Sequence, residues 1–241
     1  MSGKISTSPY WRVDSVPERV PRRVLMLPGV GYSCDRPLLS WCSAIAHQRG
    51  WWVQRAWWTV RPESNNDAFV SAALTRLDHD APDADTTLVI AKSMGSRAAA
   101  ASSRRRWAGV WLTPLLTDPV VREALLGYRG DCLLVGGDAD RHWSPPSGRV
   151  DETLTAQRSP GSAVAGLARL GAVEDDGSSE VTPAHPEVSS SGRSGARLRQ
   201  SWVQVTGANH SLEIPGDWRA SVQVQRAVFG IVDDFLGRLG G

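Results

Sequence analysis

The chain has 241 residues and a mass of 26.1 kDa, which is long enough for one domain of ordinary size with a full hydrophobic core. Its residues are 41% hydrophobic and 22% charged, and the formal net charge is only +2. These values exclude a disordered acidic protein, a collagen-like fibre and a strongly basic nucleic-acid binder. We therefore expect a single domain over residues 1–241 that does not bind nucleic acid.

Apolar strands and amphipathic helices alternate along the chain. After a polar, proline-containing lead, the pattern predicts a strand at Val24–Leu27, a helix from Asp35 to Gly50, a strand at Trp51–Trp58 and a helix at Asp67–Leu77. It continues with a strand at Thr87–Ile90, an alanine-rich helix to about Ser103, a strand at Gly109–Leu112 and a helix from Asp118 to Leu126. The last predicted elements are strands at Cys132–Val135 and Trp202–Val205 and a helix that begins at Asp217. Continuous apolar strands between helices indicate a parallel sheet covered on both faces, so the fold class is α/β.

Residues 151–200 break this alternation. They are rich in short polar runs such as 175–179 and 189–192, and they lack sustained periodicity. This composition predicts a flexible surface insertion between two core elements. A mobile flap over a pocket is the functional alternative.

The cysteines and the N-terminus bear on the compartment. Cys34, Cys42 and Cys132 are an odd number without CxxC spacing, which argues against a disulfide scaffold or a zinc site and for a reducing compartment. The N-terminal residues have no apolar stretch typical of a secretory signal, and no run of about 18 apolar residues predicts a membrane span. We expect a cytoplasmic protein without membrane association; the sequence does not indicate its oligomeric state.

The sharpest functional signal is Ala91-Lys92-Ser93-Met94-Gly95, which lies between a predicted strand and a predicted helix. The nucleophile elbow of α/β-hydrolases is written GxSxG in the same strand–turn–helix setting. Small residues are needed two positions before and after the serine, because the tight turn brings them against the adjoining elements. Ala91 replaces the first glycine, and Gly95 is present. Ser93 as a simple helix cap is the alternative, which the strand–helix context disfavours.

A serine nucleophile needs a base and an acid that orients the base. In α/β-hydrolases they follow the serine in the order acid, then histidine, each after a strand. His210 is the histidine that follows the last predicted strand, and it is the candidate base. Asp140 is the preferred acid; Asp138 in the same loop and Asp118, whose place before a proline suits a helix cap, are the alternatives.

Acyl transfer also needs two donors for the oxyanion. The backbone N–H of Met94 is one candidate, and the loop after the first strand offers the N–H of Val30, with that of Gly31 next. Gly31, Tyr32 and Trp143 are candidate substrate contacts, with packing at the edge of the core as the alternative for the aromatic residues. The loop is not a GxGxxG nucleotide loop, because no third glycine follows.

The chain resembles the α/β-hydrolase superfamily, in particular its small members related to dienelactone hydrolases. The resemblance is carried by LPGVGYSCDRPLL (27–39), AKSMGS (91–96), WLTPLL (111–116), LLVGGDADRHW (133–143) and VTGANHSLEIPGDW (205–218). It implies an eight-stranded, mostly parallel sheet and a triad of Ser93, Asp140 and His210, with backbone donors at Val30 and Met94. The residues between the strand ending at Leu112 and the next helix are too few for a cap domain.

Three departures accompany this resemblance: Pro28-Gly29 replaces the common His-Gly, Ala91 replaces the first glycine of the elbow, and the gap from Asp140 to His210 is long at 70 positions, which fits an insertion. The sequence and this resemblance together predict a serine hydrolase that cleaves a carboxylic ester or thioester of a small-molecule acyl substrate. A hydrolase-fold binding or scaffold protein without turnover is the alternative from another class, and an acyltransferase or peptidase would use the same triad. No metal or organic cofactor is expected, because acyl transfer by a triad needs none.

Overall fold

The computed structural model describes residues 3–60, 66–156, 168–169 and 200–239. Its strands are β1 (Gly3–Pro9), β2 (Arg19–Leu27), β3 (Trp52–Val60), β4 (Asp83–Lys92), β5 (Ala108–Leu112), β6 (Cys132–Gly137), β7 (Glu152–Thr155), β8 (Ala168–Arg169) and β9 (Gln200–Val205). Its helices are α1 (Pro37–Gln48), α2 (Asn66–Asp80), the 3₁₀ helix η1 (Ser93–Ala98), α3 (Ala99–Arg104), α4 (Pro119–Leu126) and α5 (Trp218–Leu239).

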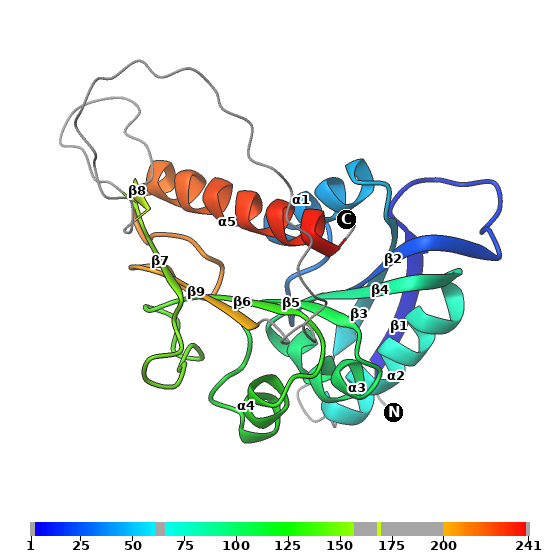
Figure 1. Ribbon diagram of the computed structural model, residues 1–241, viewed down its shortest axis with the longest axis horizontal. Helices are drawn as coiled ribbons and strands as arrows, with labels where there is room; N and C mark the ends of the chain where they lie inside the picture. Colours follow the sequence, from blue (N-terminus) through cyan, green and yellow to red (C-terminus); the bar gives the residue numbers. More distant parts are fainter. Residues whose placement is uncertain (1–2, 61–65, 157–167, 170–199, 240–241) are drawn as a thin grey trace, which may run out of the picture.

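The described strands form one sheet in the order β1-β3-β2-β4-β5-β6-β9-β7-β8 (Figure 1). Pairings inside the sheet are parallel, and only the two edge pairings, β1 with β3 and β7 with β8, are antiparallel in the described chain. The central strands β5 and β6 are buried at every residue, as expected for a parallel sheet covered on both faces. The predicted α/β class is therefore confirmed.

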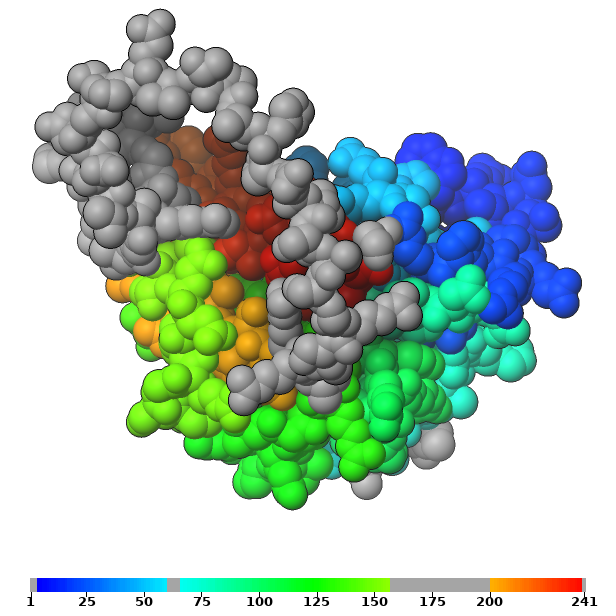
Figure 2. Space-filling view, in the orientation of Figure 1, coloured from blue at the N-terminus to red at the C-terminus, as the bar shows by residue number. Residues whose placement is uncertain are grey.

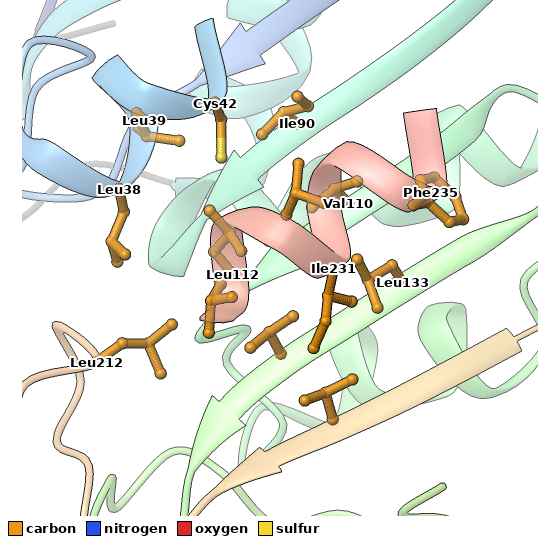
Figure 3. Packing of buried hydrophobic residues seen from close by; sticks show 14 of the residues in the cluster. Leu38, Leu39, Cys42, Ile90, Val110, Leu112, Leu133, Leu212, Ile231 and Phe235 are labelled. Atoms are coloured by element: carbon orange, nitrogen blue, oxygen red, sulfur yellow. The ribbon is translucent and has the colours of Figure 1, made fainter. Parts of the chain in front are cut away.

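Helices cover both faces of the sheet (Figure 1). On one face, α1 and α5 pack on the strands, and Figure 3 shows Ile231 and Phe235 of α5 pointing toward Val110, Leu112 and Leu133. On the other face, α2, α3 and α4 bury a second cluster that includes Phe69, Leu74, Ala99, Val121 and Leu125. These two apolar layers cover the faces of the sheet, so the strand ends can carry polar groups without loss of the core.

The two edges of the sheet differ from the sequence expectation. β1 lies in the polar lead that the pattern did not assign to a strand; it pairs on one side only and therefore needs no apolar run. At the opposite edge, Glu152–Thr155 form β7 beside β9, so the predicted flexible insertion at 151–200 is wrong for these residues. Most of that insertion lies outside the described residues. Figure 2 shows the N-terminal segment (blue) and the segment near residue 150 (yellow-green) on opposite sides of the molecule.

The implied count of eight strands is also corrected, since the described residues contain nine, including the two-residue β8. The connection from β5 to α4 spans only residues 113–118, which leaves no room for a cap domain there. Strands β2, β4, β6 and β9 are mutually parallel through their neighbours, so the loops that follow them leave from one edge of the sheet. In open α/β sheets ligands bind beyond this carboxyl edge.

Candidate active site

Ser93 lies at the sharp turn where β4 ends and η1 begins. Its φ is +51°, a left-handed conformation that non-glycine residues adopt rarely and that costs on the order of 1–3 kcal/mol. The turn is tight because Gly95 packs on the end of β2: a Cβ on Gly95 would lie 2.7 Å from the Leu27 carbonyl oxygen. Ser93 is half-buried at the end of the strand, while Met94 and Gly95 after it are buried.

His210 connects Ser93 to a carboxylate. Its Nε2 lies 2.7 Å from Ser93 Oγ, and its Nδ1 lies 2.7 Å from Asp140 Oδ2. An ionised carboxylate can only accept, so Nδ1–H donates to Asp140 and Nε2 is left to accept from the serine hydroxyl. The structure thus brings together three side chains that are 47 or more positions apart in the sequence and come from the ends of three strands.

Asp140 is the most deeply buried of the three, with a side chain that is 0% exposed. Burial alone pushes its pKa upward, but the hydrogen bond from His210 and the bond from the backbone N–H of His142 outweigh burial and hold the pKa of Asp140 below its usual value. The carboxylate therefore stays ionised beside the imidazole at neutral pH.

The other two candidate acids have different partners. Asp138 Oδ1 accepts from the backbone N–H of Gly207 at 2.6 Å. Asp118 caps α4 by accepting from the N–H groups of Val120 and Val121, and it also pairs with Arg97. Only Asp140 of the three contacts His210 among the hydrogen bonds of the described chain.

The loops that carry Asp140 and His210 are joined by their backbones. Ala139 N–H donates to the Ala208 carbonyl at 3.1 Å, beside the contact between Asp138 and Gly207. Gly137 permits this approach, because a Cβ there would lie 2.0 Å from the Ala208 carbonyl oxygen. These contacts fix the acid and the imidazole relative to each other.

The candidate oxyanion loop follows β2 and passes close to Ser93. A Cβ on Gly29 would lie 3.2 Å from Ser93 Cβ, and Gly31 has a φ of +65° that favours glycine. Val30 between them is 63% exposed. Met94 is the second residue of η1, and the first N–H groups of a helix have no partner within the helix. The loop and the helix start therefore flank the serine.

The two aromatic residues predicted to contact substrate, Tyr32 and Trp143, lie in different environments. Tyr32 lies on the oxyanion loop, where its hydroxyl accepts from the Leu38 N–H at 3.0 Å. Trp143 is buried to 7% exposure in the apolar cluster under α4, its indole N–H donates to Gln204, and its ring fills the space above Gly136. The placement of Trp143 corrects its prediction as a substrate contact, because the indole is held in the core.

Sequence reasoning missed Lys92, the residue directly before Ser93. Its side chain is buried and its Nζ donates to the backbone carbonyl of His210 at 2.9 Å. The available signal was a charged residue at the end of the apolar run Leu88–Ala91, where a strand residue facing the core would otherwise stand. His142, a second imidazole, lies edge-on to His210 with ring centroids 5.3 Å apart, and its Nδ1 contacts Thr117 Oγ1.

Within the described residues, no group of three or more His, Cys, Asp or Glu side chains is arranged to hold a metal ion. The three cysteines are free and buried, and burial raises the pKa of each thiol to about 12. The helices of the described chain are all too short or too polar to cross a bilayer.

The strand order, the strained serine turn and the loop positions define the α/β-hydrolase fold, and comparison with solved structures agrees. Est1E from Butyrivibrio proteoclasticus, solved with ferulic acid bound, matches with a TM-score of 0.58 at 13% identity, over 98% of this chain and 95% of that one. A Xanthomonas campestris α/β serine hydrolase without a lid matches with a TM-score of 0.54 at 10% identity, over 98% and 89% of the two chains.

A dienelactone hydrolase from Anabaena variabilis matches with a TM-score of 0.50 at 13% identity, over 99% of both chains. No protein-family model and no curated protein sequence matches the chain. At these identities the likenesses establish the fold.

Proposed function

We propose that the chain is a serine hydrolase that cleaves carboxylic esters or thioesters through an acyl-enzyme on Ser93. The observation that carries this proposal is the continuous path from Ser93 Oγ through both ring nitrogens of His210 to Asp140, with both contacts at 2.7 Å. Nucleophile, base and orienting acid at hydrogen-bond distance are the arrangement that activates a serine.

In the first half-reaction, Ser93 Oγ attacks the acyl carbonyl carbon while its proton passes to His210 Nε2. Asp140 keeps the imidazole in the reactive tautomer and stabilises the imidazolium that forms. The tetrahedral intermediate then collapses: the bond to the leaving alkoxide or thiolate breaks, and that group takes the proton from His210 Nε2. The acyl group remains as an ester on Ser93.

In the second half-reaction, water attacks the acyl-enzyme and gives its proton to His210 Nε2. Collapse of this second intermediate breaks the bond to Ser93 Oγ, which takes the proton back from His210. The products are a carboxylic acid and free enzyme. We assign the oxyanion of both intermediates to the backbone N–H groups of Val30 and Met94, because Gly29 lies against Ser93 and η1 begins at Ser93, so both segments are next to the serine.

The triad is the basis for choosing an ester or thioester as the substrate class, because a serine activated by a histidine and a carboxylate attacks acyl carbonyl carbons. Among the similar structures, one is described as a serine hydrolase and another as a dienelactone hydrolase, which is in line with this choice. The three free thiols favour a reducing compartment, and we propose a cytoplasmic location on that ground.

The test is turnover of a panel of short acyl esters and thioesters by the wild type, Ser93→Ala and a matched control, Ser71→Ala on the exposed face of α2. We expect activity in the wild type and the control, and a loss of several orders of magnitude in Ser93→Ala. A wild type without turnover on any member, with intact fold, would favour a hydrolase-fold binding protein and overturn the proposal. Equal activity in Ser93→Ala would do the same.

A further inference from the structure

Lys92 is a buried lysine at the end of β4 that the reaction steps above do not use. Its side chain is 2% exposed, among the largest fully buried side chains of the described residues. An ammonium group removed from water is costly unless other groups replace its hydration. Its contacts therefore indicate what the lysine does.

The ammonium group contacts two different loops. Nζ donates to the His210 carbonyl at 2.9 Å, and it also lies 4.5 Å from the centroid of the Tyr32 ring, within the range of a cation–π interaction. Tyr32 is itself anchored, because its hydroxyl accepts from the N–H of Leu38 at the start of α1. Lys92 thus joins the loop that carries His210 to the loop that carries Val30, and the next residue in its own chain is Ser93.

The charged groups that face Lys92 are carboxylates on two loops, Asp140 after β6 and Glu213 after β9, together with the titratable side chain of Tyr32. Burial lowers the pKa of Lys92 to about 8, against the opposing effect of Asp140 and Glu213. Burial likewise raises the pKa of Tyr32 to about 12, so this phenol remains neutral over the range in which Lys92 loses its proton. A neutral amine keeps a weak donor but loses the attraction to the ring and to both carboxylates.

We propose that Lys92 is a positioning residue of the proposed hydrolase, whose ammonium group fixes the His210 loop and the Tyr32 loop against Ser93. It touches no reacting atom and acts through the backbone of His210 and the ring of Tyr32. The inference rests on the proposed function. A residue needed only to fill space would be replaced without loss by an unbranched apolar side chain of similar length.

Lys92→Met tests this, since methionine fills a similar volume without a charge or a donor. Lys92→Arg, which keeps the positive charge and donors, is the conservative partner. We expect kcat for an ester substrate to fall on the order of 10- to 100-fold in Lys92→Met with KM changed less than about threefold, because misplacement of the reacting groups by about 1 Å costs rate rather than binding. Lys92→Arg should recover part of that loss.

The pH profile separates positioning from packing. In the wild type, kcat should decline as pH rises through about 8, where Lys92 loses its proton, and this decline should be absent from Lys92→Met. Circular dichroism at each pH serves as the control that both proteins remain folded. Wild-type kcat in Lys92→Met, or a wild-type kcat that stays level from pH 7 to 9.5, would overturn the proposal, and the second measurement needs no variant to fold.

The two proposals fail in different ways. A wild type that turns over no ester and does not differ from Ser93→Ala contradicts the hydrolase and the inference together. A wild type with Ser93-dependent turnover, beside a fully active Lys92→Met, contradicts the positioning role alone.

Discussion

Gly95 packs so closely on Leu27 that a Cβ on the glycine would lie 2.7 Å from the Leu27 carbonyl oxygen and 3.0 Å from its Cβ. Leu27 ends β2, and the oxyanion loop begins at the next residue, so this contact sets the distance between that loop and Ser93. It also explains why position 95 requires a glycine. The first glycine of the elbow is replaced by Ala91, whose methyl group packs in the apolar cluster of α2, α3 and α4.

Gly95→Ala is therefore expected to destabilise the protein, since the nearest obstructing atom is a backbone carbonyl oxygen that cannot move aside. Overpacking of this kind costs about 1–3 kcal/mol, and the shift of the elbow should lower kcat as well. Thermal unfolding and ester turnover measure both effects. The matched control is Gly230→Ala on the exposed side of α5, where a Cβ meets nothing within 4 Å. That change should raise the free energy of unfolding by about 0.5–1 kcal/mol, and equal effects from the two substitutions would contradict the close contact.

Asp140→Asn is expected to lower kcat on the order of 10⁴-fold, because an amide in place of the carboxylate favours the wrong imidazole tautomer. Asp138→Asn is the control in the same loop. Its side chain accepts from the Gly207 N–H, and an asparagine oxygen accepts equally, so kcat should stay within about tenfold of the wild type. Steady-state kinetics of the two variants measure both values of kcat. A larger loss of kcat in Asp138→Asn than in Asp140→Asn would show that the wrong aspartate has been assigned.

The stability of the protein should also depend on Lys92 at alkaline pH. Its pKa falls from 10.5 to about 8 on folding, so between these values the unfolded chain binds the proton that the folded chain has lost. Stability from this group therefore rises with pH over that window, by an amount on the order of 3 kcal/mol. The buried cysteines act oppositely: their pKa rises from 9.0 to about 12, so their contribution falls above pH 9.

Comparison of the wild type with Lys92→Met removes the cysteine contribution, because both proteins contain the same thiols. Urea unfolding at pH 7.5 and pH 10 should show the wild type gaining stability relative to Lys92→Met as pH rises. A constant difference between the two proteins would show that folding does not lower the pKa of Lys92.

Strands buried on both faces are the easiest to predict from the sequence pattern, because they need continuous apolar runs. β5 and β6 illustrate this, with every residue buried. Strands β1 and β7 near the sheet edges have no continuous apolar run and were not predicted. β1 has the sequence Gly-Lys-Ile-Ser-Thr-Ser-Pro, and in β7 only Leu154 is buried. Their pairing partners come from distant parts of the chain, which local periodicity cannot reveal.

The positions of the candidate catalytic residues can also be predicted from the sequence, because they follow the buried strands. Ser93, Asp140 and His210 each follow a parallel strand, and such strands end at one edge, so their order in the chain predicts that they meet. What spacing cannot decide is side-chain direction. The sequence therefore predicted Trp143 as a substrate contact, whereas the structure buries its ring against Gly136. The sequence analysis also overlooked Lys92, whose side chain donates to the His210 carbonyl.

The central claim is that Ser93 is the activated nucleophile, and the most direct measurement is its covalent reaction with a fluorophosphonate, followed by intact mass and peptide mapping. We expect one phosphonyl adduct per chain, located on Ser93, absent from Ser93→Ala and formed at least about 10³-fold more slowly in His210→Ala. An adduct on another residue, or one that forms at the wild-type rate without the imidazole of His210, would contradict the account.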